Sequence, residues 1–125
     1  MPPVYVALDL ETTGLSPEHD AIIEIGAVRF RADRVLDTWS TLVNPRRPIP
    51  LKVQYLTGIS QADVETAPPL TAALASLRGF VGEHAVVGHN ISFDLAFLSR
   101  HGVLTQNPPL DTFELASILL PEAAR

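Results

Sequence analysis

The sequence contains no cysteine, which excludes disulfides and thiolate metal sites, so that any bound metal must be held by oxygen or imidazole ligands. It also has no window approaching the roughly 20 apolar residues of a membrane helix, and no charged-then-apolar leader opens it. We therefore expect a protein of the cytoplasm that does not enter a membrane.

Positive charge is scarce as well: 9 Lys and Arg residues stand against 14 Asp and Glu, a net charge of −5. Nucleic-acid-binding proteins usually carry a basic surface. Either the partner is not a polyanion, or the carboxylates gather at a site whose bound cations reverse the local charge. Composition leaves both interpretations open.

The chain is long enough and apolar enough for one domain with a buried core, having 125 residues of which 46% are hydrophobic. Apolar runs rich in β-forming residues predict strands at 4–11, 22–30 and 35–43. The link between the second and third runs is so short that these two strands must be antiparallel neighbours. The proline-rich segment 44–50 predicts a loop, and 56–60 a brief helical turn.

The second half alternates between helix and strand. A 3.6-residue apolar stripe after Pro68 and Pro69 predicts a helix over 70–81, followed by a buried strand at 85–88 and an amphipathic helix over 91–101. A last helix is expected from Asp111, with Glu114 in a capping box, to Pro121. This order indicates an α/β fold of ribonuclease H-like type: a mixed sheet, first an antiparallel meander and then parallel, flanked by helices.

Two acidic residues, Asp9 and Glu11, interrupt the end of the first buried strand. Residues two apart in a strand share a face, so the two carboxylates project together, about 7 Å apart at the backbone. Carboxylates that close repel each other unless a cation bridges them, and oxygen ligands suit Mg²⁺ or Mn²⁺. The alternative is that the strand simply ends there and both acids are solvated.

Two motifs carry a family resemblance. Residues 9–15 read DLETTGL and residues 88–94 read GHNISFD, with EIGA, NP, LTGI and DT segments at 24–27, 44–45, 56–59 and 111–112. In these motifs the chain resembles the DnaQ-like 3′→5′ exonucleases of the DEDD group, histidine type. That group includes the proofreading epsilon subunit of bacterial DNA polymerase III and exonuclease domains fused to helicases. The resemblance extends over nearly the whole chain.

The resemblance implies a catalytic site of Asp9, Glu11 and Asp94 that binds two Mg²⁺ or Mn²⁺ ions and cleaves terminal phosphodiester bonds. It also implies contacts with the terminal nucleotide from Thr12, Thr13, Gly14, Leu15, Leu56, His89, Asn90 and Phe93. Phe93 is as readily a core residue, and His89 and Asn90 could instead cap the helix. Glu24 stays outside the predicted site.

The family's third motif, His-x-x-x-x-Asp, supplies a general base and a fourth carboxylate, and residues 95–125 contain no such pattern. His89 with Asp94 matches this pattern but lies inside the second motif. A tyrosine variant of the family uses Tyr-x-x-x-Asp, which Tyr5 with Asp9 matches, but this pair lies in the first strand. We therefore expect residues 1–125 to form a single exonuclease domain that is incomplete at its C-terminus. Missing helices would leave apolar surface uncovered, which favours a homodimer.

Three functions remain open at this point. The first is hydrolysis of DNA from a single-stranded 3′ end, in DNA replication or repair, with a polymerase or helicase module fused or separate. The second is an exoribonuclease, since the same motifs serve both substrates. The third is a non-catalytic nucleic-acid-binding subunit, which the intact acids oppose and the missing third motif favours.

Overall fold

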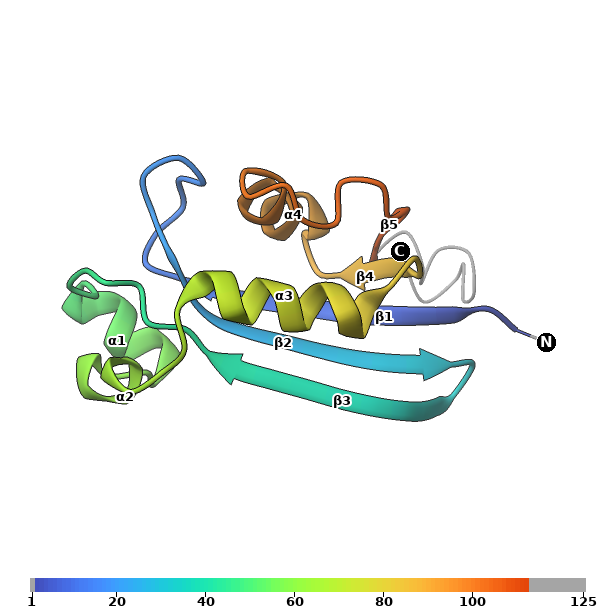
Figure 1. Cartoon of the computed structure of the whole chain (residues 1–125), viewed down its shortest axis with the longest axis horizontal. Helices are drawn as coiled ribbons and strands as arrows, with labels where there is room; N and C mark the ends of the chain where they lie inside the picture. The colour runs from blue at the N-terminus through green and yellow to red at the C-terminus, as the bar shows by residue number, and fades with distance from the viewer. Residues whose placement is uncertain (1, 113–125) are drawn as a thin grey trace, which may run out of the picture.

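The computed structural model describes residues 2–112, which form one mixed five-stranded sheet with helices (Figure 1). The strands lie in the order β3-β2-β1-β4-β5. β1 pairs antiparallel with β2 and parallel with β4, β2 pairs antiparallel with β3, and β5 is parallel to β4. Their bounds are Val4–Thr12 (β1), Ile22–Arg31 (β2), Arg34–Leu42 (β3), Ala85–Gly88 (β4) and Pro109–Asp111 (β5). The expected meander followed by parallel strands is confirmed.

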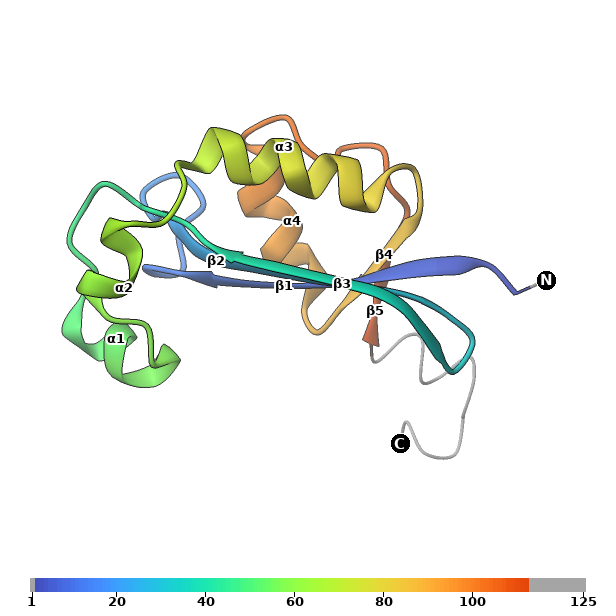
Figure 2. The same cartoon turned by 60° about the horizontal axis from the view of Figure 1, so that its bottom comes forward.

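One face of the sheet carries the core. Val6, Leu8 and Leu10 of β1 are buried, while the alternate residues Ala7, Asp9 and Glu11 point to the other side. The helices α3 (Leu70–Val81) and α4 (Ile91–Ser99) both contribute to the cluster on the buried face. Seen edge-on, these two helices lie on the same side of the sheet (Figure 2). Asp9 and Glu11 therefore belong to the face opposite α3 and α4.

The segment between β3 and α3 holds two short helices where a single turn at 56–60 was predicted, and that prediction was wrong. Helix α1 spans Leu51–Thr57 and ends at Gly58, whose φ of 74° suits a residue without a side chain. Helix α2, Gln61–Glu65, begins with a capping box between Ser60 and Asp63. The helix α1 has no buried residue, so its sequence shows no periodic apolar pattern that would predict a helix. The Ser60 and Asp63 pair of this capping box can be recognised in the sequence.

The other predicted elements are confirmed with small shifts. Helix α3 has its predicted bounds, and α4 ends at Ser99, with Gly102 at φ 72° soon after. Asp111 closes strand β5, and the next residue, Thr112, is already helical, as expected for a helix that begins at Asp111. The predicted roles of Glu114 and Pro121 lie outside the described residues. No helix within residues 2–112 is long and apolar enough to cross a membrane.

Candidate active site

The site forms where β4 stops short of β1. The pairing of these parallel strands ends at Ala7 and Val87, so the last part of β1 has no strand on that side. The N-terminal turn of α4 takes that place, because the chain passes directly from β4 into α4. Gly88 makes the approach possible: a Cβ there would lie 2.9 Å from the Leu8 carbonyl oxygen. This approach brings the second acidic motif to the first.

Asp94 lies in the first turn of α4 and is 5% exposed. Its carboxyl accepts a hydrogen bond from the backbone N–H of Leu10, in the unpaired stretch of β1. Asp94 thus replaces the missing neighbour strand as acceptor for this N–H. Because Leu10 lies between Asp9 and Glu11, the bond ties all three acidic residues to one short stretch of backbone.

Burial and the neighbouring acids raise the pKa of Asp94 and of Glu11. Burial, followed by the negative charge of Asp9 and then of Glu11, raises the pKa of Asp94 to about 7, although the Leu10 N–H acts in the opposite direction. Burial also raises the pKa of Glu11, and the charges of Asp9 and Glu24 add to this effect. A cation placed among these groups would favour their ionised forms and relieve the repulsion.

Glu24 is a member of this cluster that the sequence prediction left out. It is the direct partner of Glu11 in the antiparallel register of β1 and β2, so both side chains lie on the same face. The signal in the sequence was an acid within an apolar strand. Without the register it could not be assigned to the same face as Glu11.

The donor set fits a hard divalent cation such as Mg²⁺ or Mn²⁺, since Asp9, Glu11 and Asp94 offer only oxygen ligands. Within residues 2–112, no three His, Asp or Glu side chains stand close enough together to form a complete metal centre. Mg²⁺ in phosphate-processing sites is commonly held by one or two carboxylates with water and substrate phosphate. Two of these acids would supply the carboxylates of such a site, and water and substrate phosphate the remaining ligands.

The loop after β1 carries the remainder of the first motif and is closed by its own hydrogen bonds. Thr12 Oγ1 donates to the Gly14 carbonyl oxygen at 2.6 Å. The Thr13 hydroxyl, 4% exposed, donates to Asp20 Oδ1 at 3.1 Å and accepts from Ala21 N–H at 2.9 Å. The backbone N–H of residue 16 binds the other Asp20 oxygen at 2.9 Å. Thr13 is thus a buried structural residue of this loop.

Two predicted apolar contacts for the terminal base are exposed. The exposed fractions are 84% for Leu15, in this loop, and 70% for Leu56, on α1. Both are available to a ligand. They remain predictions, because their exposure alone does not identify what they bind.

The three predicted contact residues near Asp94, which are His89, Asn90 and Phe93, lie in different environments. His89 is exposed and lines a cavity of about 680 Å³ together with Asp9, over the sheet face opposite the helices. Asn90 stands at the N-cap of α4 with φ 54° and makes no side-chain capping bond; Asp111 Oδ2 accepts from Ile91 N–H at 3.2 Å instead. Phe93 packs on the core, its ring 5.1 Å from that of Phe97. A capping role therefore does not explain Asn90, whereas a core role does explain Phe93.

The sheet is mixed, and the acids gather where β1 extends beyond β4. Together these features define a nuclease with the ribonuclease H-like fold. Exonuclease I, at 19% identity and TM-score 0.79, shares this fold over 98% of the chain. The chain belongs to the RNase_T family of exonucleases, which it matches over residues 6–125. The resemblance to DnaQ-like exonucleases is thereby confirmed.

Relatives in this family include parts of much larger polymerases. The chain is 40% identical over 122 residues to the PolC-type DNA polymerase III of Clostridium perfringens, and 36% identical over 124 residues to that of Bacillus subtilis. These matches take in 94% of the chain but only 8% and 9% of the polymerases. A solved structure of exonuclease X in complex with 5′ overhanging duplex DNA is 30% identical, with TM-score 0.71, over 94% of this chain and 64% of that one.

Proposed function

We propose that this chain is a 3′→5′ exonuclease domain acting on DNA, with Asp9, Glu11 and Asp94 as its catalytic carboxylates. The observation that carries the proposal is the bond from Leu10 N–H to the Asp94 carboxyl, between the two other acids on β1. It joins two motifs far apart in the sequence into one acidic site. Membership of the exonuclease family supports the same chemistry.

Asp9 and Asp94 would hold one divalent cation, and Asp9 and Glu11 a second. Such ions supply Lewis acidity and neutralise charge at the scissile phosphate. The protein's part is to gather the carboxylates, whose ionised forms the cations would favour, and to orient the terminal nucleotide. Thr12, Gly14, Leu15 and Leu56 are the proposed contacts on one side, and His89 and Asn90 on the other.

The general base is the part of the mechanism that residues 1–125 do not supply in the family's usual form. No His-x-x-x-x-Asp follows Asp94 in the chain. A positioned base typically contributes about 10²–10⁴-fold to a rate. We therefore propose that these 125 residues alone turn over slowly.

DNA is favoured over RNA by two comparisons: the relatives are PolC-type DNA polymerases, and the solved exonuclease X complex contains duplex DNA. The PolC relatives also favour a polymerase as the functional partner, fused or separate. An exoribonuclease remains the second candidate, because no described contact distinguishes a 2′-hydroxyl. A non-catalytic role is opposed by the intact acids.

The test is digestion of a 5′-labelled single-stranded DNA and of an RNA of the same sequence, with Mn²⁺ or Mg²⁺ present. We expect a ladder of DNA products shortened from the 3′ end. Asp94→Asn should reduce the rate at least about 10²-fold, as removal of a metal ligand does. Glu65→Gln, an exposed change outside the site, is the control. Equal rates for wild type and Asp94→Asn would overturn the catalytic role of Asp94. Faster cleavage of the RNA would overturn DNA as the substrate.

A further inference from the structure

A second hollow lies on the other side of the sheet from Asp9 and Glu11. It has a volume of about 470 Å³, between the loop after β1, the end of β3, the start of α3 and the end of α4. Its lining includes four of the chain's basic side chains: Arg46, Arg47, Arg100 and His101. None of the three catalytic acids lines it. We call it the arginine hollow.

The arginines of this hollow are not neutralised by carboxylates. Arg47 donates to the His19 carbonyl oxygen, and Arg100 donates to the Pro17 carbonyl oxygen at 2.7 Å. The Arg46 guanidinium has no partner within residues 2–112, and in that part of the chain none of the three forms an ion pair. Carbonyl bonds engage only part of a guanidinium's five N–H donors. Donors and charge therefore remain for an external anion.

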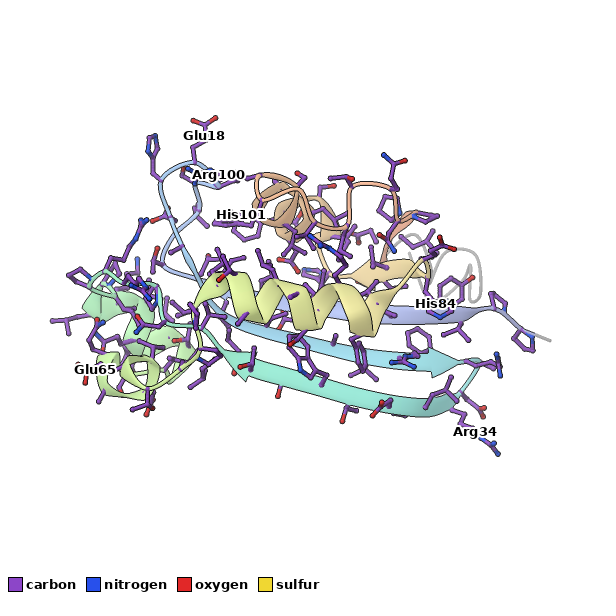
Figure 3. All side chains as sticks on the ribbon, viewed as in Figure 1. Glu18, Arg34, Glu65, His84, Arg100 and His101 are labelled. Carbon is purple, nitrogen blue, oxygen red and sulfur yellow. The ribbon has the colours of Figure 1, made fainter. Side chains whose placement is uncertain are left out.

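One acid, Asp20, is among the residues that line the hollow, against three arginines, so the lining keeps a net positive charge. The two Asp20 oxygens accept from the Thr13 hydroxyl and from Ser16 N–H. Glu18, in the same loop, extends outward at the edge of the molecule, whereas Arg100 and His101 lie nearer α4 (Figure 3). In a chain with 14 acids and a net charge of −5, a hollow lined by three arginines and one acid is a local concentration of positive charge that favours an anion.

The start of α3 adds to the positive potential of the arginine hollow. Leu70 and Thr71, at the first turn of this 12-residue helix, line it. Pro69 provides no side-chain cap, and the first turn contains no acid. The partial positive charge of the helix end is thus unopposed on the side that faces the hollow. It supplements the arginines, which carry the argument.

We propose that the arginine hollow binds a phosphate of the nucleic-acid backbone, at a second point away from the carboxylate site. Planar guanidiniums match phosphate oxygens in a bidentate way, and the volume accommodates a nucleotide unit as well as its phosphate. The loop after β1 borders both places, so one bound strand or duplex can reach each of them. The inference rests on the proposed function for the nature of the ligand.

The first test measures binding without catalysis. Fluorescence anisotropy of labelled DNA oligonucleotides of increasing length is recorded in EDTA, where no hydrolysis occurs, at several salt concentrations. Arg46→Gln and Arg100→Gln should weaken binding of the longer oligonucleotides several-fold and lower the slope of log affinity against log salt by about one each. Arg46→Gln removes a side chain without a partner, so it leaves the fold intact. Arg34→Gln, at the opposite end of the sheet, removes the same charge and is the matched control (Figure 3).

The second test follows His101, whose pKa is lowered by burial and by the charge of Arg100. An anion in the hollow should raise this pKa again. Imidazole NMR signals titrated with inorganic phosphate, and with the oligonucleotide, report it directly. His84, which lines neither the carboxylate site nor the hollow, serves as the internal reference.

The outcomes separate the alternatives. Variants of Arg46 and Arg100 that bind DNA like Arg34→Gln, with an unchanged His101 pKa, would overturn the site. A His101 pKa raised by inorganic phosphate alone, with unchanged DNA affinity, would overturn the nucleic-acid ligand. Loss of metal-dependent cleavage in the digestion experiment would reject the proposed function while leaving the EDTA binding results standing.

Discussion

Glu11 and Glu24 face each other as direct partners across β1 and β2, with both carboxylates on the sheet face opposite the helices. Like charges in that register are unfavourable, and Glu24 contributes to the raised pKa of Glu11. This pairing extends the acidic site onto a second strand.

Removing the charge of Glu24 should lower the pKa of Glu11 and so make Glu11 a stronger acid. In Glu24→Gln we expect the pKa of Glu11 to fall toward its ordinary value, because one of the three causes of the rise is gone. Carboxyl ¹³C chemical shifts followed against pH in EDTA measure it. Glu65→Gln is the control, and an unmoved Glu11 pKa would show that the pair is screened by water.

The metal-free protein should lose stability as the pH rises from about 4 to 7. The folded pKa of Asp94, about 7, exceeds its ordinary 3.8, so over this range the folded state holds a proton that the unfolded state has released. The free energy of unfolding therefore falls, by up to a few kcal/mol, and levels off above pH 7. Asp94→Asn should flatten the curve. Urea unfolding of both proteins in EDTA at pH 5 and pH 8 checks this, and parallel curves would contradict it.

Divalent cations should restore the stability that the metal-free protein loses as the pH rises. At pH 8, Mn²⁺ or Mg²⁺ should raise the melting temperature, since the ion binds the folded acids only; a concentration 100 times the Kd contributes about 2.7 kcal/mol. Asp9→Asn should abolish most of the rise. Scanning calorimetry with increasing metal is the measurement, and an equal rise in the variant would mean that the ions bind elsewhere.

Gly14 should tolerate no side chain. A Cβ at this position would lie 2.4 Å from Asp20 Oδ2, a carboxylate held by Thr13 and Ser16. We expect Gly14→Ala to destabilise the protein by about 1–3 kcal/mol through overpacking. Gly79→Ala is the matched control: nothing lies within 4 Å of its Cβ, and alanine favours the α3 helix by about 1 kcal/mol. Equal melting temperatures for the two variants would refute the clash.

Residual cleavage by these 125 residues should depend on hydroxide. Without a protein base, metal-bound water must lose its proton to solvent, so the rate should climb with pH and be greater with Mn²⁺ than with Mg²⁺. Initial rates on end-labelled DNA from pH 6.5 to 9.5 measure it. A bell-shaped profile would place a titrating base within residues 1–125, with His89 the first to replace.

Local sequence was sufficient for most of the fold. The strand runs and the α3 stripe are periodic patterns within a single element, so β1, β2 and α3 were predictable. The helices α1 and α2 were not predicted as such, because their residues have few buried contacts and therefore little periodicity.

The sequence by itself determined that Asp9 and Glu11 share a face, since alternation along a strand is a local property. Only the tertiary structure decided what joins them. Glu24 comes opposite Glu11 through the β1–β2 register, and Asp94 reaches Leu10 because β4 ends where α4 begins. The arginine hollow likewise assembles residues from β3's end and α4's end. Such relationships depend on pairing and packing between distant segments, which no local pattern specifies.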